Sequence, residues 1–145
     1  GVGAKDRVKE FSDRQVANLV WAFATVAATD GDAMFLRVEE TVDMDSLAPI
    51  DLSLVTWALA KLCRGGERFY EEAARATVRK SKAWEQSDTR NIATLIYAFA
   101  LSEQASTHAE AFAILAEATS RRPSEFTVQG LTNAVWGYAT AAFAE

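Results

Sequence analysis

The chain has few of the residues that build cross-linked or metal-bound proteins: one cysteine, one histidine, two prolines and seven glycines among 145 residues. Cys63 alone cannot form an intramolecular disulfide, which excludes a disulfide-stapled secreted scaffold. Cys63 ends the apolar run LAKLC, and we expect it to be buried as a small hydrophobic residue. His108 is the single histidine, so a His-based metal cluster is excluded, and we expect neither a metal nor a cofactor. The scarcity of proline and glycine favours helices over strands.

Sequence features of membrane proteins and enzymes are also missing. No run approaches the roughly 20 apolar residues of a membrane-spanning helix, so we expect a soluble chain without membrane insertion. There is no glycine-rich phosphate loop. The carboxylates at 39–40 and 71–72 form adjacent pairs on polar helix faces, not a convergent acid–base pair. We therefore expect no catalytic residues and no enzyme activity.

Basic charge is not concentrated in any part of the chain. The net charge is −5, to which residues 1–47 contribute −4, residues 48–87 contribute +2 and residues 88–145 contribute −3. A protein that wraps duplex nucleic acid normally carries a basic stripe, because phosphate neutralisation supplies most of its non-specific affinity. The composition argues against that class of protein.

What the sequence does contain is an internal repeat. Four segments align without gaps: VANLVWAFATV at 16–26, LSLVTWALAKL at 52–62, IATLIYAFALS at 92–102 and LTNAVWGYATA at 131–141. Their aromatic residues Trp21, Trp57, Tyr97 and Trp136, here called the anchors, are 36, 40 and 39 residues apart. Helix start signals precede or open the four segments in the same register, at Ser12, Pro49, Asp88 and Thr127. A fixed period of this length is typical of stacked helical repeats.

Each segment has two apolar helix faces side by side, which together cover about half of the circumference. Stacked neighbours would bury both, and we expect the anchors to fill the gap between layers. A second helix follows at about 33–42, 68–80 and 108–119, and linkers at 43–49, 81–87 and 120–126 join the repeats. Trp84, in the second linker, is expected to pack between layers, with base stacking as the alternative.

These patterns predict an all-α fold, an α-solenoid of about four stacked helix-turn-helix repeats with a period of 36–40 residues and an incomplete last repeat. We divide the chain into an N-terminal extension, 1–10, and one helical-repeat domain, 11–145. Its repeats are at about 11–46, 47–86, 87–125 and 126–145. The chain starts with Gly and stops within a helical pattern, so we expect it to be a piece of a longer protein.

The motif of a capped start followed by φ-x-N-φ-φ-Trp-Ala-φ-Ala resembles the octotricopeptide repeat, which is found in organelle proteins of algae and related protists. Similar arrays accompany RAP domains. Residues 15–24 and 131–139 match the motif best. The second copy has Leu54 where Asn is usual, and the third has Thr94 there and Tyr97 in place of Trp. The resemblance implies sequence-selective binding of single-stranded RNA in a chloroplast or mitochondrion, for RNA processing, stability or translation.

Polar residues that face away from both apolar faces form a candidate binding stripe. Arg, Asn, Gln and Thr can hydrogen-bond base edges, and RNA-binding helical repeats use such recurring positions. The candidate residues are Arg14, Asn18, Thr25, Lys61, Arg90, Thr94, Gln129, Asn133 and Thr140. The alternative is that these are ordinary solvated or inter-helix polar residues. Ile50 and Leu54 occupy equivalent positions, and an apolar patch there suits a protein partner better than RNA.

A second set of candidates is basic. Arg75, Arg79 and Lys82 are spaced to share one helix face, where they could contact phosphates or simply solvate an outer helix beside Glu71 and Glu72.

The end of the repeat array leads to a further expectation. The last helix reads VWGYATAAFA, so its outer side is apolar unless another segment or protein covers it. We expect protein partners or adjoining repeats at the open ends, and self-association of the isolated chain. The competing hypothesis to RNA binding is a protein scaffold or structural subunit of a large organellar complex, such as a ribosome or photosynthetic assembly.

Overall fold

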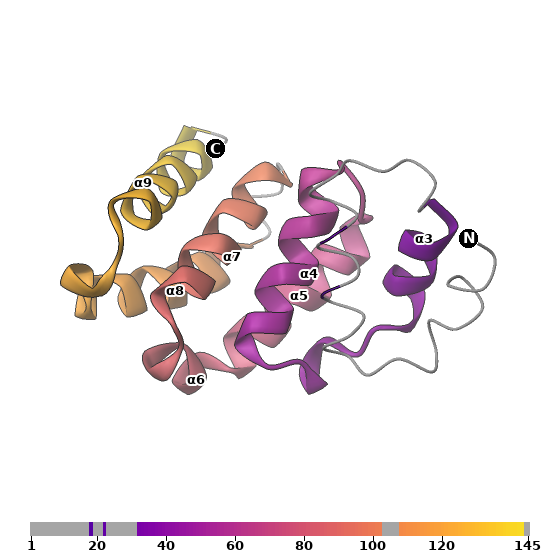
Figure 1. The fold of residues 1–145 in the computed structure, drawn as a ribbon, viewed down its shortest axis with the longest axis horizontal. Coiled ribbons are helices and arrows are strands. Elements are labelled where there is room, and N and C mark those ends of the chain that lie inside the picture. The colour runs from indigo at the N-terminus through magenta and orange to yellow at the C-terminus, as the bar shows by residue number, and fades with distance from the viewer. Residues whose placement is uncertain (1–17, 19–21, 23–31, 103–107, 144–145) are drawn as a thin grey trace.

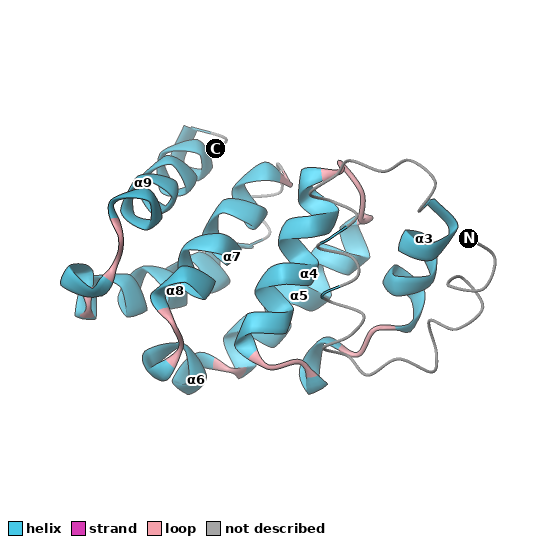
Figure 2. Ribbon diagram, viewed as in Figure 1, coloured by secondary structure: helices cyan, strands magenta, loops and turns pink. Residues whose placement is uncertain are grey.

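The computed structural model describes residues 18, 22, 32–102 and 108–143. Within them the chain is all-helical and has no strand (Figure 2). The longer helices are α3 (Asp32–Thr41), α4 (Pro49–Lys61), α5 (Glu67–Arg79), α7 (Thr89–Leu101), α8 (Ala109–Arg121) and α9 (Val128–Phe143). Three short helical segments lie in the linkers: η2 (Met44–Ser46), α6 (Ser81–Gln86) and η4 (Pro123–Glu125).

The helix starts predicted for the second, third and fourth copies are confirmed. Pro49 is the first residue of α4, where its missing N–H leaves no hydrogen bond unmade. The Asp88 carboxylate accepts a hydrogen bond from the Arg90 N–H at 2.9 Å, and the Thr127 hydroxyl accepts one from the Gly130 N–H at 3.0 Å. Local chemistry alone therefore sets these three starts. Ser12 lies outside the described residues.

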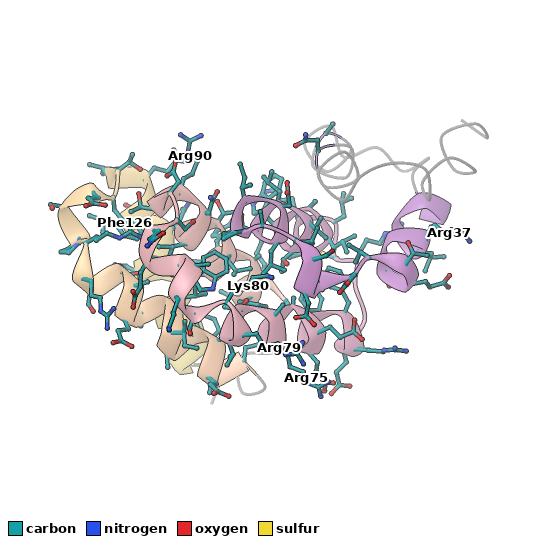
Figure 3. All side chains as sticks on the ribbon, turned by 90° about the horizontal axis from the view of Figure 1, so that it is seen from below. Arg37, Arg75, Arg79, Lys80, Arg90 and Phe126 are labelled. Atoms are coloured by element: carbon teal, nitrogen blue, oxygen red, sulfur yellow. The ribbon has the colours of Figure 1, made fainter. Side chains whose placement is uncertain are left out.

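The helices lie in two layers (Figures 1 and 3). In the first-helix layer, α4 packs against α7 and α7 against α9. In the second-helix layer, α5 packs against α8. The core between them consists of fully buried aliphatic and aromatic side chains such as Leu52, Leu59, Ile92, Phe99 and Leu115. Burying one such side chain contributes roughly 1.5–3 kcal/mol, so the layers are held mainly by apolar packing.

Trp84 is part of this core, as the packing alternative predicted. Its ring has no exposed surface, and its Nε1 donates a hydrogen bond to the carbonyl oxygen of Thr77 at 3.0 Å. Met44 is also buried and lies 13 residues before its anchor, as Trp84 does. The linkers thus place a large apolar residue into the core at the same register, and base stacking on Trp84 is excluded because the ring is covered.

Basic residues at the end of each second helix close the helix pair. Arg79 pairs with Asp45 at 2.5 Å, and Arg121 pairs with Glu85; both acids lie 12 residues before their anchors. The next residue, Arg122, donates to the carbonyl oxygens of Ser87 at 3.0 Å and Trp84 at 2.8 Å. Exposed ion pairs stabilise by little, whereas this half-buried Arg fork satisfies two carbonyls at a helix end.

Two expectations for the connections are wrong. The linker at 81–87 is not a plain loop, because residues 81–86 form α6. Cys63 is exposed, not buried. The Arg64 N–H bonds to the Leu59 carbonyl and the Cys63 N–H to the Ala60 carbonyl, which is the hydrogen-bond pattern of a Schellman helix end. This turn places Cys63 at a φ of 56°, and its side chain therefore leaves the core.

Candidate functional site

One side of the first-helix layer is not covered by the second layer, and we call it the open face. It is formed by four register positions on each described first helix: Ile50, Leu54, Trp57 and Lys61 on α4; Arg90, Thr94, Tyr97 and Leu101 on α7; Gln129, Asn133, Trp136 and Thr140 on α9. Each of these side chains whose burial is described is half-buried or exposed. The positions recur every third or fourth residue, so they lie on one side of each helix.

The structure brings together five of the nine predicted stripe residues. Lys61, Arg90, Thr94, Gln129 and Asn133 lie on the open face, on three helices that pack side by side. The sixth, Thr140, belongs to the same face of α9, and its side chain is not described. Asn18 is helical and exposed. Arg14 and Thr25 lie outside the described residues.

The anchors also lie on the open face, and this differs from the expectation that they fill the gap between layers. Trp57 and Tyr97 are half-buried, and Trp136 is 43% exposed. The rings of Tyr97 and Trp136 pack against each other across adjacent helices, with centroids 5.0 Å apart and planes tilted by 38°. Trp21 lies outside the described residues.

The position of the anchors could have been found in the sequence. Trp57 follows Leu54 by three residues and precedes Lys61 by four, a spacing that places all three on one side of a helix. The core between the layers is filled instead by other residues, such as Leu59 and Phe99. Sequence reasoning assigned the anchors to the interior because large aromatic side chains are usually buried.

The polar side chains of the open face are not used by the fold. Within the described residues, the Arg90 guanidinium and the side-chain amides of Gln129 and Asn133 make no hydrogen bond or ion pair. By contrast, Arg79 is held by Asp45, and Arg122 by backbone carbonyls. Groups of this kind on a partly exposed surface are available to a ligand.

The charge of the open face differs from that of the whole chain. Its twelve positions include two cations, Lys61 and Arg90, and no aspartate or glutamate. The chain as a whole has a net charge of −5. The face also changes along the layer, from Ile50 and Leu54 on α4 to Gln129 and Asn133 on α9. A negatively charged ligand would therefore meet less repulsion here than elsewhere on the protein.

The predicted phosphate contacts lie on the other side of the molecule. Figure 3 shows Arg75 and Arg79 on the side opposite to Arg90. Lys82 does not continue their helix face, because α5 ends at Arg79 and Lys82 belongs to α6. Two hollows adjoin Arg75 and Arg79, with volumes of about 340 and 260 Å³.

Both hollows are lined by carboxylates as well as arginines. The first includes Glu71 and Glu110, and the second includes Asp43, Asp45 and Glu72. These carboxylates counter the arginines, and a phosphate would be repelled by them. The second-helix layer is therefore a weaker candidate for an anionic ligand than the open face.

The described part of the chain contains no group of three or more His, Cys, Asp or Glu side chains arranged to hold a metal ion. Among the same residues, none of the helices combines the length and apolar character required to cross a membrane. No protein-family model, curated protein or solved structure matches the chain. The geometry of the open face is therefore the basis for a functional assignment.

Proposed function

We propose that the chain is a non-catalytic α-solenoid module whose open face binds single-stranded RNA. One observation carries the proposal: aromatic side chains, uncombined hydrogen-bonding groups and two cations share a face that has no carboxylate among its twelve positions. Aromatic rings offer stacking surfaces for unpaired bases, and the polar groups can bond their edges. Duplex nucleic acid fits less well, because the face offers two cations and not a basic stripe.

The roles of the individual residues follow from their chemistry. Trp136 has the largest exposed fraction among the described anchors and would stack on a base, a contact worth about 1–3 kcal/mol. Gln129 and Asn133 lie on the same face of α9 and could bond the edge of that base. Arg90 and Lys61 would contact phosphates along the strand. Each repeat would then bind a short stretch of the strand, in the manner of one-base-per-repeat RNA binders.

The resemblance to octotricopeptide repeats supports the same ligand. It also implies a place of action in a chloroplast or mitochondrion, in RNA processing, stability or translation. We include that location in the proposal on the strength of the motif in residues 15–24 and 131–139.

The test is the affinity of the purified chain for a fluorescently labelled pool of random single-stranded RNA, at low and moderate salt. Trp136→Ala should weaken binding roughly 10- to 100-fold, as expected for the loss of one stacked base. Trp136→Phe keeps a ring and should retain most of the affinity. Arg90→Ala should lower the slope of log affinity against log salt by about 0.7, the value for one phosphate on a single strand.

Arg75→Ala is the matched control, because Arg75 is an exposed cation on the opposite side of the molecule. It should leave both the affinity and the salt dependence unchanged. Absence of binding at low salt would refute the proposal. An equal loss of affinity in Arg75→Ala and Arg90→Ala would show non-specific attraction to cations and would refute the assignment of the open face.

A second candidate function is supported by α4. Its part of the open face contains Ile50, Leu54 and Trp57, all half-buried, and a half-buried apolar patch suits a protein partner in a scaffold or a large organellar complex. Leu54→Asp should then abolish retention of that partner during purification, while Trp136→Ala should not. This pattern, together with no RNA binding at low salt, would favour the scaffold.

A further inference from the structure

The side of α9 that faces away from α7 is apolar and uncovered. Figure 1 shows α9 at one end of the first-helix layer, with α7 on its inner side. Val128 is 84% exposed and Val135 is 67% exposed, and Thr132 and Ala139 on the same side are also exposed. The 16 residues of α9 include no charged side chain. We call these four residues the tail edge.

The register of the repeat indicates what the tail edge can receive. Val128 and Val135 occupy the positions that Thr89 and Ile96 occupy in α7, and both α7 residues are buried. Ile96 lies directly under Gly137 of α9, where an added Cβ would come within 2.5 Å of the Ile96 Cγ2. The natural partner of Val135 is therefore a small residue, one position after an anchor, on a helix of the same type.

The same chain carries such a residue at the other end of the array. The residues directly after the four anchors are Ala22, Ala58, Ala98 and Gly137. Ala58 and Ala98 are fully buried in the stack. Ala22, in the first copy, is helical and exposed. We call Ala22 the head edge, because it has the register of the residues that pack on a preceding first helix.

We propose that two copies of this chain associate head to tail, with the first helix of one copy packed on α9 of the other and Ala22 placed over Val135. The contact continues the α7–α9 interface between molecules. By register, Trp21 of the second copy would lie beside Trp136, as Trp136 lies beside Tyr97 at 5.0 Å. The tail edge buries apolar surface without desolvating a charge, which favours association.

The two edges are different surfaces, so the contact is heterologous and does not close after two copies. The molecular mass measured by light scattering after size exclusion should therefore rise with protein concentration beyond that of a dimer. Val135→Glu should block the tail edge and Ala22→Glu the head edge, and each variant alone should remain a monomer at concentrations where the wild type averages two copies or more. Both side chains are exposed, so neither substitution disturbs the core.

Mixing the two variants tests the direction of the contact. Val135→Glu keeps its head edge and Ala22→Glu keeps its tail edge, so an equimolar mixture should form dimers and nothing larger. Gln129→Glu places the same charge on the open face of α9 and should associate like the wild type. A wild type that stays monomeric at all concentrations would overturn the proposal. So would Ala22→Glu that still dimerises, because that result would indicate a symmetric contact between two tail edges.

Discussion

Replacement of Gly137 by alanine distinguishes repeat logic from packing. The other three copies have alanine at this position, and alanine in a helix is favoured over glycine by about 1 kcal/mol. Repeat logic therefore predicts that Gly137→Ala stabilises the protein. In the structure, the added Cβ would lie 2.5 Å from the Ile96 Cγ2 and 3.3 Å from the Ile96 carbonyl oxygen. The first distance is roughly 1 Å shorter than a normal carbon–carbon contact of about 3.5 Å.

We expect the clash to decide the sign. Overpacking a well-filled site costs about 1–3 kcal/mol, so Gly137→Ala should lower the free energy of unfolding by about 1 kcal/mol after the helix-propensity gain is included. Ile96→Ala alone should cost about 2–5 kcal/mol, because it leaves a cavity. In the Ile96→Ala background the clash is absent, and Gly137→Ala should stabilise by about 1 kcal/mol. The coupling between the two sites should thus be about 2 kcal/mol.

The assay is urea unfolding followed by circular dichroism, at a protein concentration low enough to keep self-association from contributing. Gly130→Ala is the control in the same helix, because its nearest atom on α7 would be the Ala93 Cβ at an ordinary 3.8 Å. We expect it not to destabilise the protein. If Gly137→Ala stabilised the wild type by about 1 kcal/mol, or if its effect were the same in both backgrounds, the packing argument would be refuted.

Three further predictions use the same unfolding assay. Arg122→Lys should cost about 1–3 kcal/mol, because one ammonium cannot reproduce the fork that bonds the carbonyls of Ser87 and Trp84. Trp84→Phe should cost about 1–3 kcal/mol, because the buried carbonyl of Thr77 loses its indole N–H donor. Burial, with a smaller contribution from nearby acidic groups, raises the pKa of Tyr70 above its usual range. The folded state therefore holds this proton more tightly than the unfolded state, and the free energy of unfolding should fall as pH rises above about 10, but by less in Tyr70→Phe.

Each of these has an outcome that would contradict it. Equal stability of the lysine variant and the wild type would mean that the arginine fork contributes nothing beyond its charge. Unchanged unfolding of the phenylalanine variant at 84 would mean that water replaces the indole donor. If the variant at Tyr70 and the wild type lost stability equally above about pH 10, the loss would come from lysines, which titrate in the same range.

Much of the fold was predictable because its signals are local. The anchors recur at a fixed period, and the caps at Asp88 and Thr127 act on N–H groups two and three residues away. Such contacts are present in any short segment that contains the motif. For the same reason the bounds of α5 and α8 agree with the predicted second helices to within one or two residues.

The candidate site was predictable only in part. Helical spacing placed Arg90, Gln129 and Asn133 on one face, as the structure has them. It did not assign the anchors to that face, because whether a large aromatic residue is covered depends on the neighbouring helices. Cys63 was missed for a related reason: its exposure follows from the path of the turn, not from the apolar run before it.

By itself, then, the sequence determined the helices, their ends and the register that relates one repeat to the next, since these depend on residues within a few positions of each other. Tertiary structure decided which side chains remain exposed and which polar groups are already used. The bonds of Arg122 to Ser87 and Trp84 join residues more than 30 positions apart, and the exposure of Val135 follows from there being no helix beside α9 among the described residues. Local spacing carries no information about such distant partners, because only the packed chain brings them into contact.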